Sequence, residues 1–475
     1  MAAIPRGRAE RQETAVRVVS VTPPWTRRRV LGTGARVGAL ALASSVAGAC
    51  RRRRVDRPNV LLVTLDTTRA DHLGCYGYGR DTSPALDALA VESTVYTRAI
   101  APGTWTLPSH ASLFTGKCPT SHGARYDPRG SLVLASAIPN RPSLNEYRVR
   151  GVAPTEATLA GMLGKAGYRT GGFAGGPWLK AVFGLGTGFD WWDDDGIGSV
   201  NGRVAADLNA RALPWLERVE EPFFLFLNYF DAHAPLLPPA DLAARYLPAP
   251  VPPGAQPTPE QTLALYDAEI RYADQHLGEV VSLLRRRNLY DRTWIIVTSD
   301  HGELFGEHGL KGHGTAPYQE VLHVPFVSKP PLGDGGLGER ADRIQLTDVM
   351  ALVLERLALP RPDGIQSAVP PKLGRPLMAE SYVLAALYPY GDWLAVFDGD
   401  WKYMWNSQGA SALYDLAADP HEQTNLIAAD PERASSMERT MRLYLAGLPR
   451  AEGDGPAGTV DDATREALKS LGYIH

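Results

Sequence analysis

Residues 59–66 read Asn59-Val60-Leu61-Leu62-Val63-Thr64-Leu65-Asp66, a run of aliphatic and β-branched residues that ends at a carboxylate. Such a run, without polar alternation, is typical of a strand buried on both faces of a mostly parallel sheet. Two later runs have the same character, Phe223–Leu227 and Thr293–Thr298. Helical periodicity lies in Thr155–Ala166 and Leu263–Arg286. This alternation predicts βαβ units and an α/β fold.

An acidic or imidazole side chain follows each of the three strand-like runs. Asp66 follows the first, Asp231 and His233 follow the second, and Asp300 and His301 follow the third. Ligands bind beyond the carboxyl ends of the strands in such sheets, so we expect these side chains to converge. Carboxylates and an imidazole from separate strand ends suit a divalent cation. The competing interpretation is that Asp66 and Asp300 each cap a helix.

Composition places the chain among ordinary large enzymes rather than nucleic-acid-binding proteins. With 475 residues and 44% hydrophobic content, it can bury a sizeable core. Residues 1–57 hold 13 arginines against three acidic residues, so the remainder carries 36 basic and 49 acidic residues. An acidic body excludes a basic patch of the nucleic-acid type, and we expect no nucleic-acid partner.

The first 50 residues resemble a targeting segment, which we exclude from the fold. Thr26–Leu31 looks like a twin-arginine export motif, and Val37–Ala49 is a weakly apolar run too short to span a bilayer. The run ends at Cys50, which resembles a lipoprotein processing site; a plain signal peptide and a disordered arginine-rich arm are the alternatives. We therefore expect export to the periplasm or cell envelope, with membrane attachment if Cys50 is acylated. A basic linker, residues 51–57, follows.

A second informative stretch is Gly103–Lys117, which reads Gly-Thr-Trp-Thr-Leu-Pro-Ser-His-Ala-Ser-Leu-Phe-Thr-Gly-Lys. It resembles the signature of the sulfatase family, with Thr106 where that family carries a cysteine or serine. The family oxidises this residue to formylglycine, but the β-methyl group of threonine rules out an aldehyde, so formylglycine is not expected. A hydroxyl nucleophile remains at Thr106. His110 stands where the family signature has an arginine.

Four other blocks resemble sulfatases in colinear order and extend the resemblance over about residues 58–475: Leu65–Tyr78, Ser83–Ala90, Ser299–Gly314 and Leu413–Leu426. The resemblance implies the alkaline phosphatase superfamily plan: a large mixed, mostly parallel sheet sandwiched by helices, with a small C-terminal antiparallel α+β subdomain. We expect the catalytic domain to span residues 58–364 and the subdomain residues 365–475. Within the latter, residues 393–405 predict a β-hairpin around an Asp-Gly turn, and residues 463–471 a terminal helix.

The resemblance implies a metal centre as well. Asp66, Asp300 and His301 would be the ligands of one divalent ion, with Thr106 contributing its oxygen as the nucleophile. The family's ion is usually calcium. However, Thr67 stands where the family usually has a second aspartate, and together with His301 this gives weight to zinc or manganese.

The remaining candidate residues would act on the substrate. By resemblance, Lys117 orients the nucleophile and the anion, although a surface charge is the alternative. His233 contacts the substrate or protonates the leaving oxygen. His313 binds the anion, donates a proton, or completes a second metal site with Asp231 and His233. His110 binds metal or anion, or only bonds to the backbone.

The expected activity is hydrolysis of sulfate or phosphate-type esters of small molecules or glycans. A threonyl sulfate would lack an elimination route, whereas a threonyl phosphate can be displaced in line by water. A phosphodiesterase or phosphonate monoester hydrolase, a phosphoryl transferase, and an inactive protein that binds anionic glycans are the alternatives. Cys75 and Cys118 either pair or, as we favour, stay free.

Overall fold

The computed structural model describes residues 55–127, 132–133, 148–197, 202–371, 374–382 and 391–451. The chain divides into residues 1–51 and residues 52–475, and the fold below is that of the second unit. The expected export segment, Cys50 and the predicted helix at residues 463–471 lie outside the described residues. Among the helices that are described, none has both the length and the apolar character needed to cross a membrane.

An eight-stranded sheet lies at the centre, in the order β15-β2-β14-β10-β1-β9-β7-β8. The predicted strand β1 (Asn59–Leu65) lies between β10 and β9 and runs parallel to both. β14 is antiparallel to β10, so the sheet is mixed but mostly parallel, as predicted. The other strands are β2 (Thr94–Tyr96), β7 (Arg169–Phe173), β8 (Trp191–Asp193), β9 (Phe223–Tyr229), β10 (Thr293–Thr298), β14 (Phe326–Lys329) and β15 (Gly338–Arg340).

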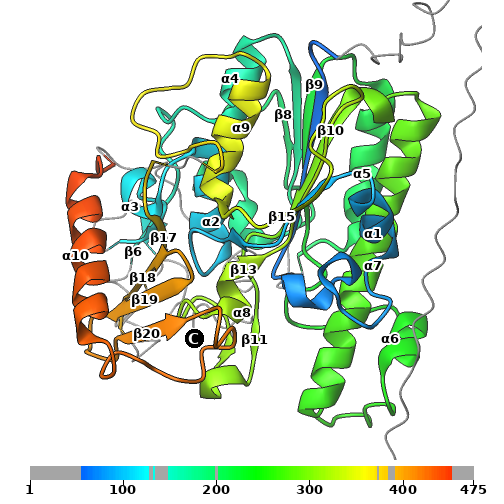
Figure 1. Cartoon of the computed structure of the whole chain (residues 1–475). Helices are drawn as coiled ribbons and strands as arrows, with labels where there is room; N and C mark the ends of the chain where they lie inside the picture. The colour runs from blue at the N-terminus through cyan, green and yellow to red at the C-terminus, as the bar shows by residue number, and fades with distance from the viewer. Residues whose placement is uncertain are drawn as a thin grey trace, which may run out of the picture. The chain divides into compact units, whose positions relative to one another are not determined.

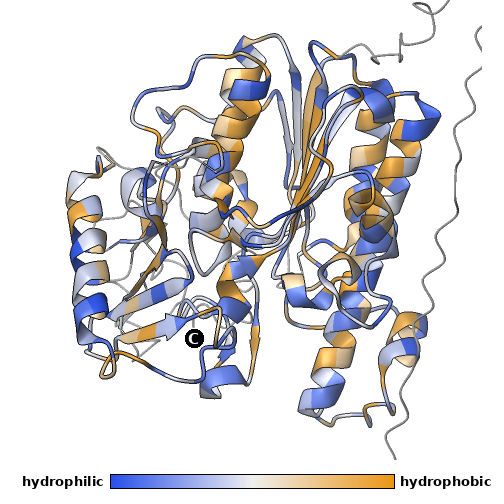
Figure 2. Ribbon diagram, in the orientation of Figure 1, coloured by the Kyte–Doolittle hydropathy of each residue, from blue (hydrophilic) through white to orange (hydrophobic). Residues whose placement is uncertain are grey.

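Helices cover both faces of this sheet because alternate residues of β1 point to opposite sides. Val60 and Leu62 pack into one core with α2, α4 and α9, whereas Leu61 and Val63 pack into another with α1, α5 and α7. Figure 1 shows these two helical layers, and Figure 2 shows hydrophobic residues concentrated on the strands and on the helices against them. The helices are α1 (Pro84–Ala90), α2 (Thr106–Thr115), α4 (Leu159–Lys165), α5 (Ala205–Arg218), α7 (Pro259–Arg286) and α9 (Val349–Arg356).

Two helices begin at residues other than those predicted, because capping hydrogen bonds fix their first turns. α7 begins four residues earlier than predicted because Thr258 and Gln261 form a capping box, each side chain accepting from the other's backbone N–H. α4 begins at Leu159 rather than at the predicted Thr155, because the Thr158 hydroxyl accepts from the N–H of Gly161 at 3.1 Å.

The C-terminal part forms the predicted antiparallel sheet, with strands β17 (Leu377–Ser381), β18 (Trp393–Asp398), β19 (Trp401–Asn406) and β20 (Ala412–Asp415) in that order. β18 and β19 make the expected hairpin, whose Gly399 adopts φ 56°. Helix α10 (Pro431–Gly447) packs on this sheet (Figure 1).

The C-terminal part also holds both ends of the segment that contains α2. The N–H of Glu380 donates to the carbonyl of Pro102 at 3.0 Å, just before the helix. The N–H groups of Gln366 and Ser367 both donate to the carbonyl of Gly116, just after it. Cys118, which follows, is buried and free, and Cys75 is also free, so the disulfide alternative is wrong.

Candidate active site

The ends of β1 and β10 bring three potential metal ligands together. Asp66 follows β1, and Asp300 and His301 follow β10; one ligand atom from each lies within 4.8 Å of the others. All three side chains are fully buried. Because β1 and β10 pair in parallel register, with Thr64 opposite Thr298, their carboxyl ends deliver these side chains to one place. The predicted convergence at this edge of the sheet is therefore present.

The capping interpretation of Asp66 and Asp300 is wrong. The helical turn after Asp66 spans Ala70–His72, and Arg69 precedes it without a side-chain cap. Asp300 Oδ1 instead accepts from the N–H groups of Thr67 at 3.2 Å and His301 at 2.9 Å. These bonds tie the loop after β1 to the loop after β10.

The chemistry of the three residues fits a divalent cation. Asp66 Oδ1 is buried without a hydrogen-bond partner. Burial, followed by the neighbouring charge of Asp300, raises the pKa of Asp66; burial also raises the pKa of Asp300. His301 Nδ1–H donates to the carbonyl of Gly302 at 2.9 Å, which leaves Nε2 as the basic nitrogen facing the carboxylates. Such an ion would neutralise the two buried carboxylates and would be bound by them and by the oriented imidazole.

Thr106 places its hydroxyl beside this cluster. It is the first residue of α2, it is fully buried, and its Oγ1 lies 3.3 Å from His301 Nε2. The N-terminus of a helix carries the positive end of the helix dipole, which favours an alkoxide and an anionic substrate there. The residue expected to be the nucleophile thus lies among the expected metal ligands.

His110 lies one turn further along α2 and fixes the position of Thr106. Its Nδ1–H donates to the carbonyl of Thr106 at 2.9 Å, and its Nε2 accepts from the hydroxyl of Thr64 at 3.1 Å. The ring is fully buried, and burial lowers its pKa. Of the three expected roles of His110, this placement favours backbone bonding over direct contact with an anion.

Asn228 also contacts this site and is a residue that was not predicted from the sequence. Its Nδ2 donates to Asp66 Oδ2 and to Thr64 Oγ1, both at 3.1 Å, and its Oδ1 accepts from the N–H groups of Gly175 and Gly176. It orients the Asp66 carboxylate from the neighbouring strand. The signal was an amide inside the otherwise apolar and aromatic run of β9, because a buried amide must find partners.

The rings of His301, His313 and His233 lie next to one another, and Glu303, a second residue that was not predicted, contacts His313. The ring of His313 lies 4.4 Å from that of His301 and 4.9 Å from that of His233, measured between centroids. His313 Nδ1 lies 2.7 Å from Glu303 Oε2. Burial lowers the pKa of His233 and His313 to about 3 and raises that of Glu303 to about 7. His233 and His313, the expected substrate histidines, therefore lie beside the group formed by Thr106, Asp66, Asp300 and His301, which we call the nucleophile cluster.

The expected second metal site with Asp231 is not formed among the described residues. Asp231 Oδ1 accepts from the N–H of Ala205 at 2.8 Å, at the start of α5. Its carboxylate therefore serves that helix rather than the imidazoles of His233 and His313.

A second ligand-type group lies at the boundary with the C-terminal sheet, where His308, Glu320 and Glu422 come close together. Here the chain supplies its own cation, since the buried amine of Lys402 lies 2.6 Å from Glu422 Oε1. His308 Nε2 lies 3.2 Å from Glu320. This arrangement is a buried ion-pair cluster and gives no reason to place a metal there.

Lys117 lies at the opposite end of α2 from Thr106. Its Nζ lies 2.6 Å from Glu156 Oε2, with the two side chains 18% and 12% exposed. At about 1.5 Å per residue, the helix separates the backbones of Lys117 and Thr106 by roughly 16 Å. This separation favours a structural ion pair over the expected contact with the anion.

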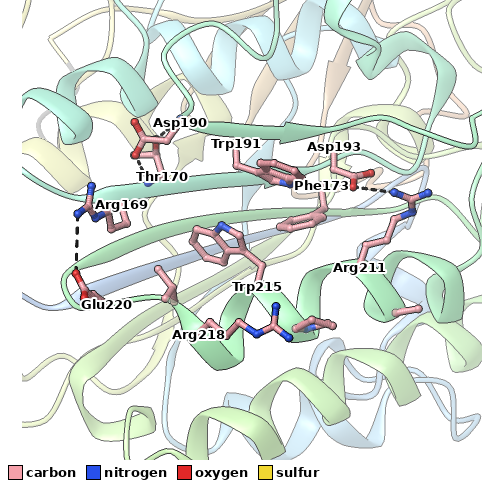
Figure 3. A pocket seen from close by; sticks show the side chains of 13 residues that line it. Arg169, Thr170, Phe173, Asp190, Trp191, Asp193, Arg211, Trp215, Arg218 and Glu220 are labelled. Atoms are coloured by element: carbon pink, nitrogen blue, oxygen red, sulfur yellow. Dashed lines mark hydrogen bonds and ion pairs between the residues drawn. The ribbon is translucent and has the colours of Figure 1, made fainter.

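A separate cavity of about 930 Å³ lies at the β8 edge of the sheet. Figure 3 shows its aromatic walls, Phe173, Trp191 and Trp215, with Arg169 and Arg211 toward its sides. Both arginines pair with acidic residues. Neither Thr106, Asp66, Asp300 and His301 nor the neighbouring His233, His313 and Glu303 line this cavity, so we do not assign it to the active site.

Comparisons with known proteins find similar sequences and similar folds. The family model described as Sulfatase matches residues 58–356. The "uncharacterized sulfatase" YidJ of Escherichia coli is 24% identical over 444 residues, covering 78% of this chain and 83% of that protein. An "ulvan-active sulfatase" of Formosa agariphila is 24% identical over 417 residues, covering 78% and 77%. The crystal structure of a phosphonate monoester hydrolase of Agrobacterium radiobacter superimposes with a TM-score of 0.65 at 19% identity, covering 82% and 96%.

Proposed function

Because the chain belongs to the sulfatase family of ester hydrolases, we propose that it is a metal-dependent hydrolase of phosphate-type esters with Thr106 as its nucleophile. The observation that carries this proposal is the position of Thr106 Oγ1, 3.3 Å from His301 Nε2 and beside the buried carboxylates. When bound by Asp66, Asp300 and His301, a divalent cation supplies charge that lowers the pKa of the hydroxyl and neutralises the oxygens of the transferred group.

The first half-reaction transfers the phosphoryl group to Thr106. The hydroxyl gives its proton to solvent water, Oγ1 attacks phosphorus in line, and the bond from phosphorus to the ester oxygen breaks, with the electron pair leaving on that oxygen. The departing alkoxide takes a proton from solvent water and leaves as the alcohol. His110 holds the backbone of Thr106 during this step through its bond to the Thr106 carbonyl.

The second half-reaction returns Thr106 to its free form. Water attacks phosphorus and gives a proton to His313, and the bond to Thr106 Oγ1 breaks; the Thr106 alkoxide takes that proton back, and the product is released, which is inorganic phosphate when the substrate is a phosphate monoester. His313 suits the role of base: burial keeps its pKa near 3, so the ring is neutral, and its bond to Glu303 makes Nε2 the basic nitrogen. His233 lies beside it to contact the substrate.

Sulfate esters are the second candidate, and the sulfatase relatives support them. Threonine cannot form the aldehyde hydrate that expels sulfate in a formylglycine enzyme, so a threonyl sulfate would accumulate. An assay with each divalent metal against aryl sulfate, phosphate monoester, phosphodiester and phosphonate substrates tests this ranking. Turnover of the phosphate-type esters supports the proposal. Turnover of sulfate alone would reverse the ranking, and turnover of no ester would favour the anionic-glycan-binding alternative.

We propose further that the protein is exported and lipid-anchored. The support is the twin-arginine-like segment Thr26–Leu31 and the processing-like context of Cys50. Replacement of Arg27 and Arg28 by lysine should retain the protein in the cytoplasm. Cys50→Ala should block incorporation of labelled palmitate; unchanged labelling would rule out this anchor.

A further inference from the structure

A small, mostly apolar cavity lies next to Glu303, the residue that contacts His313. It has a volume of about 260 Å³. Glu303, whose carboxylate holds His313, forms part of its wall, and Ala232 and Ala234, the two neighbours of His233, form another part. The remaining walls are mainly aliphatic, aromatic or proline side chains: Leu236, Pro257, Pro259, Thr262, Leu304, Phe305, Lys311 and Gly312.

A second cavity, of about 540 Å³, lies next to the first. The two cavities share Leu236 and Pro257. The second is lined only by alanine, leucine, proline and valine, without a charged side chain. Its walls come from α6 (Ala240–Tyr246), the start of α7 and the segments around them. We call the two cavities together the apolar channel.

The walls of the apolar channel are held by a small core of their own. Leu242 and Tyr246 of α6 pack against Ala264 and Ala268 of α7. The channel therefore rests on two helices that pack on each other, and the wall of its inner cavity includes Glu303, the partner of His313.

We propose that the apolar channel binds the alcohol part of the substrate, so that this hydrolase acts on esters of apolar alcohols with a long alkyl or aryl group rather than on glycan esters. This inference rests on the proposed function, because it places the leaving group of the same reaction. A sugar in the outer cavity would lose water from its hydroxyls without finding hydrogen-bond partners on walls of leucine, alanine, proline and valine. An alkyl or aryl group gains from the same burial.

The test is a series of methyl, butyl and octyl esters of the acid group that the enzyme turns over, compared with the corresponding 6-ester of glucose. Each buried methylene should raise kcat/KM about threefold, until the chain fills the channel. The glucose ester should be no better than the methyl ester. Equal kcat/KM across the alkyl series, or a preference for the glucose ester, would overturn the proposal.

The variant Ala244→Trp, compared with a control, distinguishes blockage of the channel from general damage to the protein. Ala244 is exposed on α6 and lines the outer cavity, so an indole there should fill it without disturbing the core. The ratio of octyl to methyl kcat/KM should fall about tenfold. Ala428→Trp, on an exposed turn outside the channel, is the matched control and should keep the wild-type ratio. An unchanged ratio in Ala244→Trp would contradict the channel.

A binding experiment distinguishes failure of the channel from failure of the proposed function. Calorimetry of the full-length protein with octanol should show binding with a negative heat-capacity change, weakened in Ala244→Trp. Glucose should show none. If no ester is turned over but octanol binds in this way, the proposed chemistry is wrong and the channel stands. If esters are turned over and octanol does not bind, the channel is wrong.

Discussion

His313 Nδ1 lies 2.7 Å from Glu303 Oε2, and this bond decides which nitrogen of the ring carries the proton. The carboxylate accepts the Nδ1 proton, so Nε2 is the basic nitrogen of the ring. Glu303 follows His301 by two residues, and one short loop therefore provides a proposed metal ligand and the partner of a proposed substrate histidine.

Glu303→Gln should lower kcat by about 10- to 100-fold with a much smaller change in KM. The amide oxygen can still accept from Nδ1, but the negative charge that favours proton uptake by His313 is gone. Steady-state kinetics and the pH–rate profile measure the effect, because the limb on the acidic side of the profile, which reports protonation of the base, should move. Glu339→Gln, at an exposed position of β15, is the control. Wild-type kcat and an unmoved profile would show that Glu303 only packs.

Asp66→Asn should stabilise the protein without metal and abolish its stabilisation by metal. Burial, followed by the charge of Asp300, opposes the ionisation of Asp66, so its replacement by an amide relieves about 1–3 kcal/mol of unfavourable free energy. Thermal unfolding with chelator and with calcium, manganese or zinc gives both quantities. A variant that is less stable under chelation, or that keeps the metal-dependent shift, would contradict the assignment.

Because Glu269 is buried, we expect the free energy of unfolding to fall as the pH rises toward 8. It is 5% exposed, and burial followed by the charge of Asp231 raises its pKa to about 8 from an ordinary 4.5. The fold therefore prefers the protonated carboxyl: its contribution is complete below about pH 4.5 and is lost as the pH rises toward 8. Asp231, with a pKa of about 7, acts in the same direction.

Glu269→Gln should consequently raise the free energy of unfolding at pH 8 by on the order of 3 kcal/mol and leave it almost unchanged at pH 4.5. The amide keeps an oxygen for the N–H of Leu237, which Glu269 Oε1 accepts at 2.6 Å. Urea unfolding at the two pH values measures the difference. Glu217→Gln, on the exposed side of α5, should show no such pH dependence. A loss of stability at pH 8 would show that Glu269 is ionised and paired in the fold.

The strand ends were predictable because they follow from a local pattern. An apolar run followed by a carboxylate indicates a buried parallel strand and its ligand-binding end, and Asp66, Asp300 and His301 were found in this way. Asn228 and Glu303 were missed for opposite reasons. Asn228 lies within a strand that was judged by its apolar neighbours, and Glu303 lies in a recognised motif whose partner, His313, is ten residues away on the far side of a loop.

The position of Lys117 could not be predicted from a linear motif. It closes the same short stretch as Thr106, yet a helix of ten residues separates the two. Only the direction of that helix shows that Thr106 points to the cluster and Lys117 to Glu156. Helix starts were misjudged for a related reason, since the capping bonds of Thr158 and Thr258 decide them.

The central claim is that Thr106 carries the transferred group during turnover. Rapid acid quench of the metal-loaded enzyme with an aryl phosphate-type ester, followed by peptide mass spectrometry, tests it most directly. We predict a phosphoryl adduct on Thr106 that is absent in Thr106→Ala, together with a loss of kcat of at least about 10³-fold in that variant and an unchanged circular dichroism spectrum. Retained turnover in Thr106→Ala, or an adduct on another residue, would contradict the account.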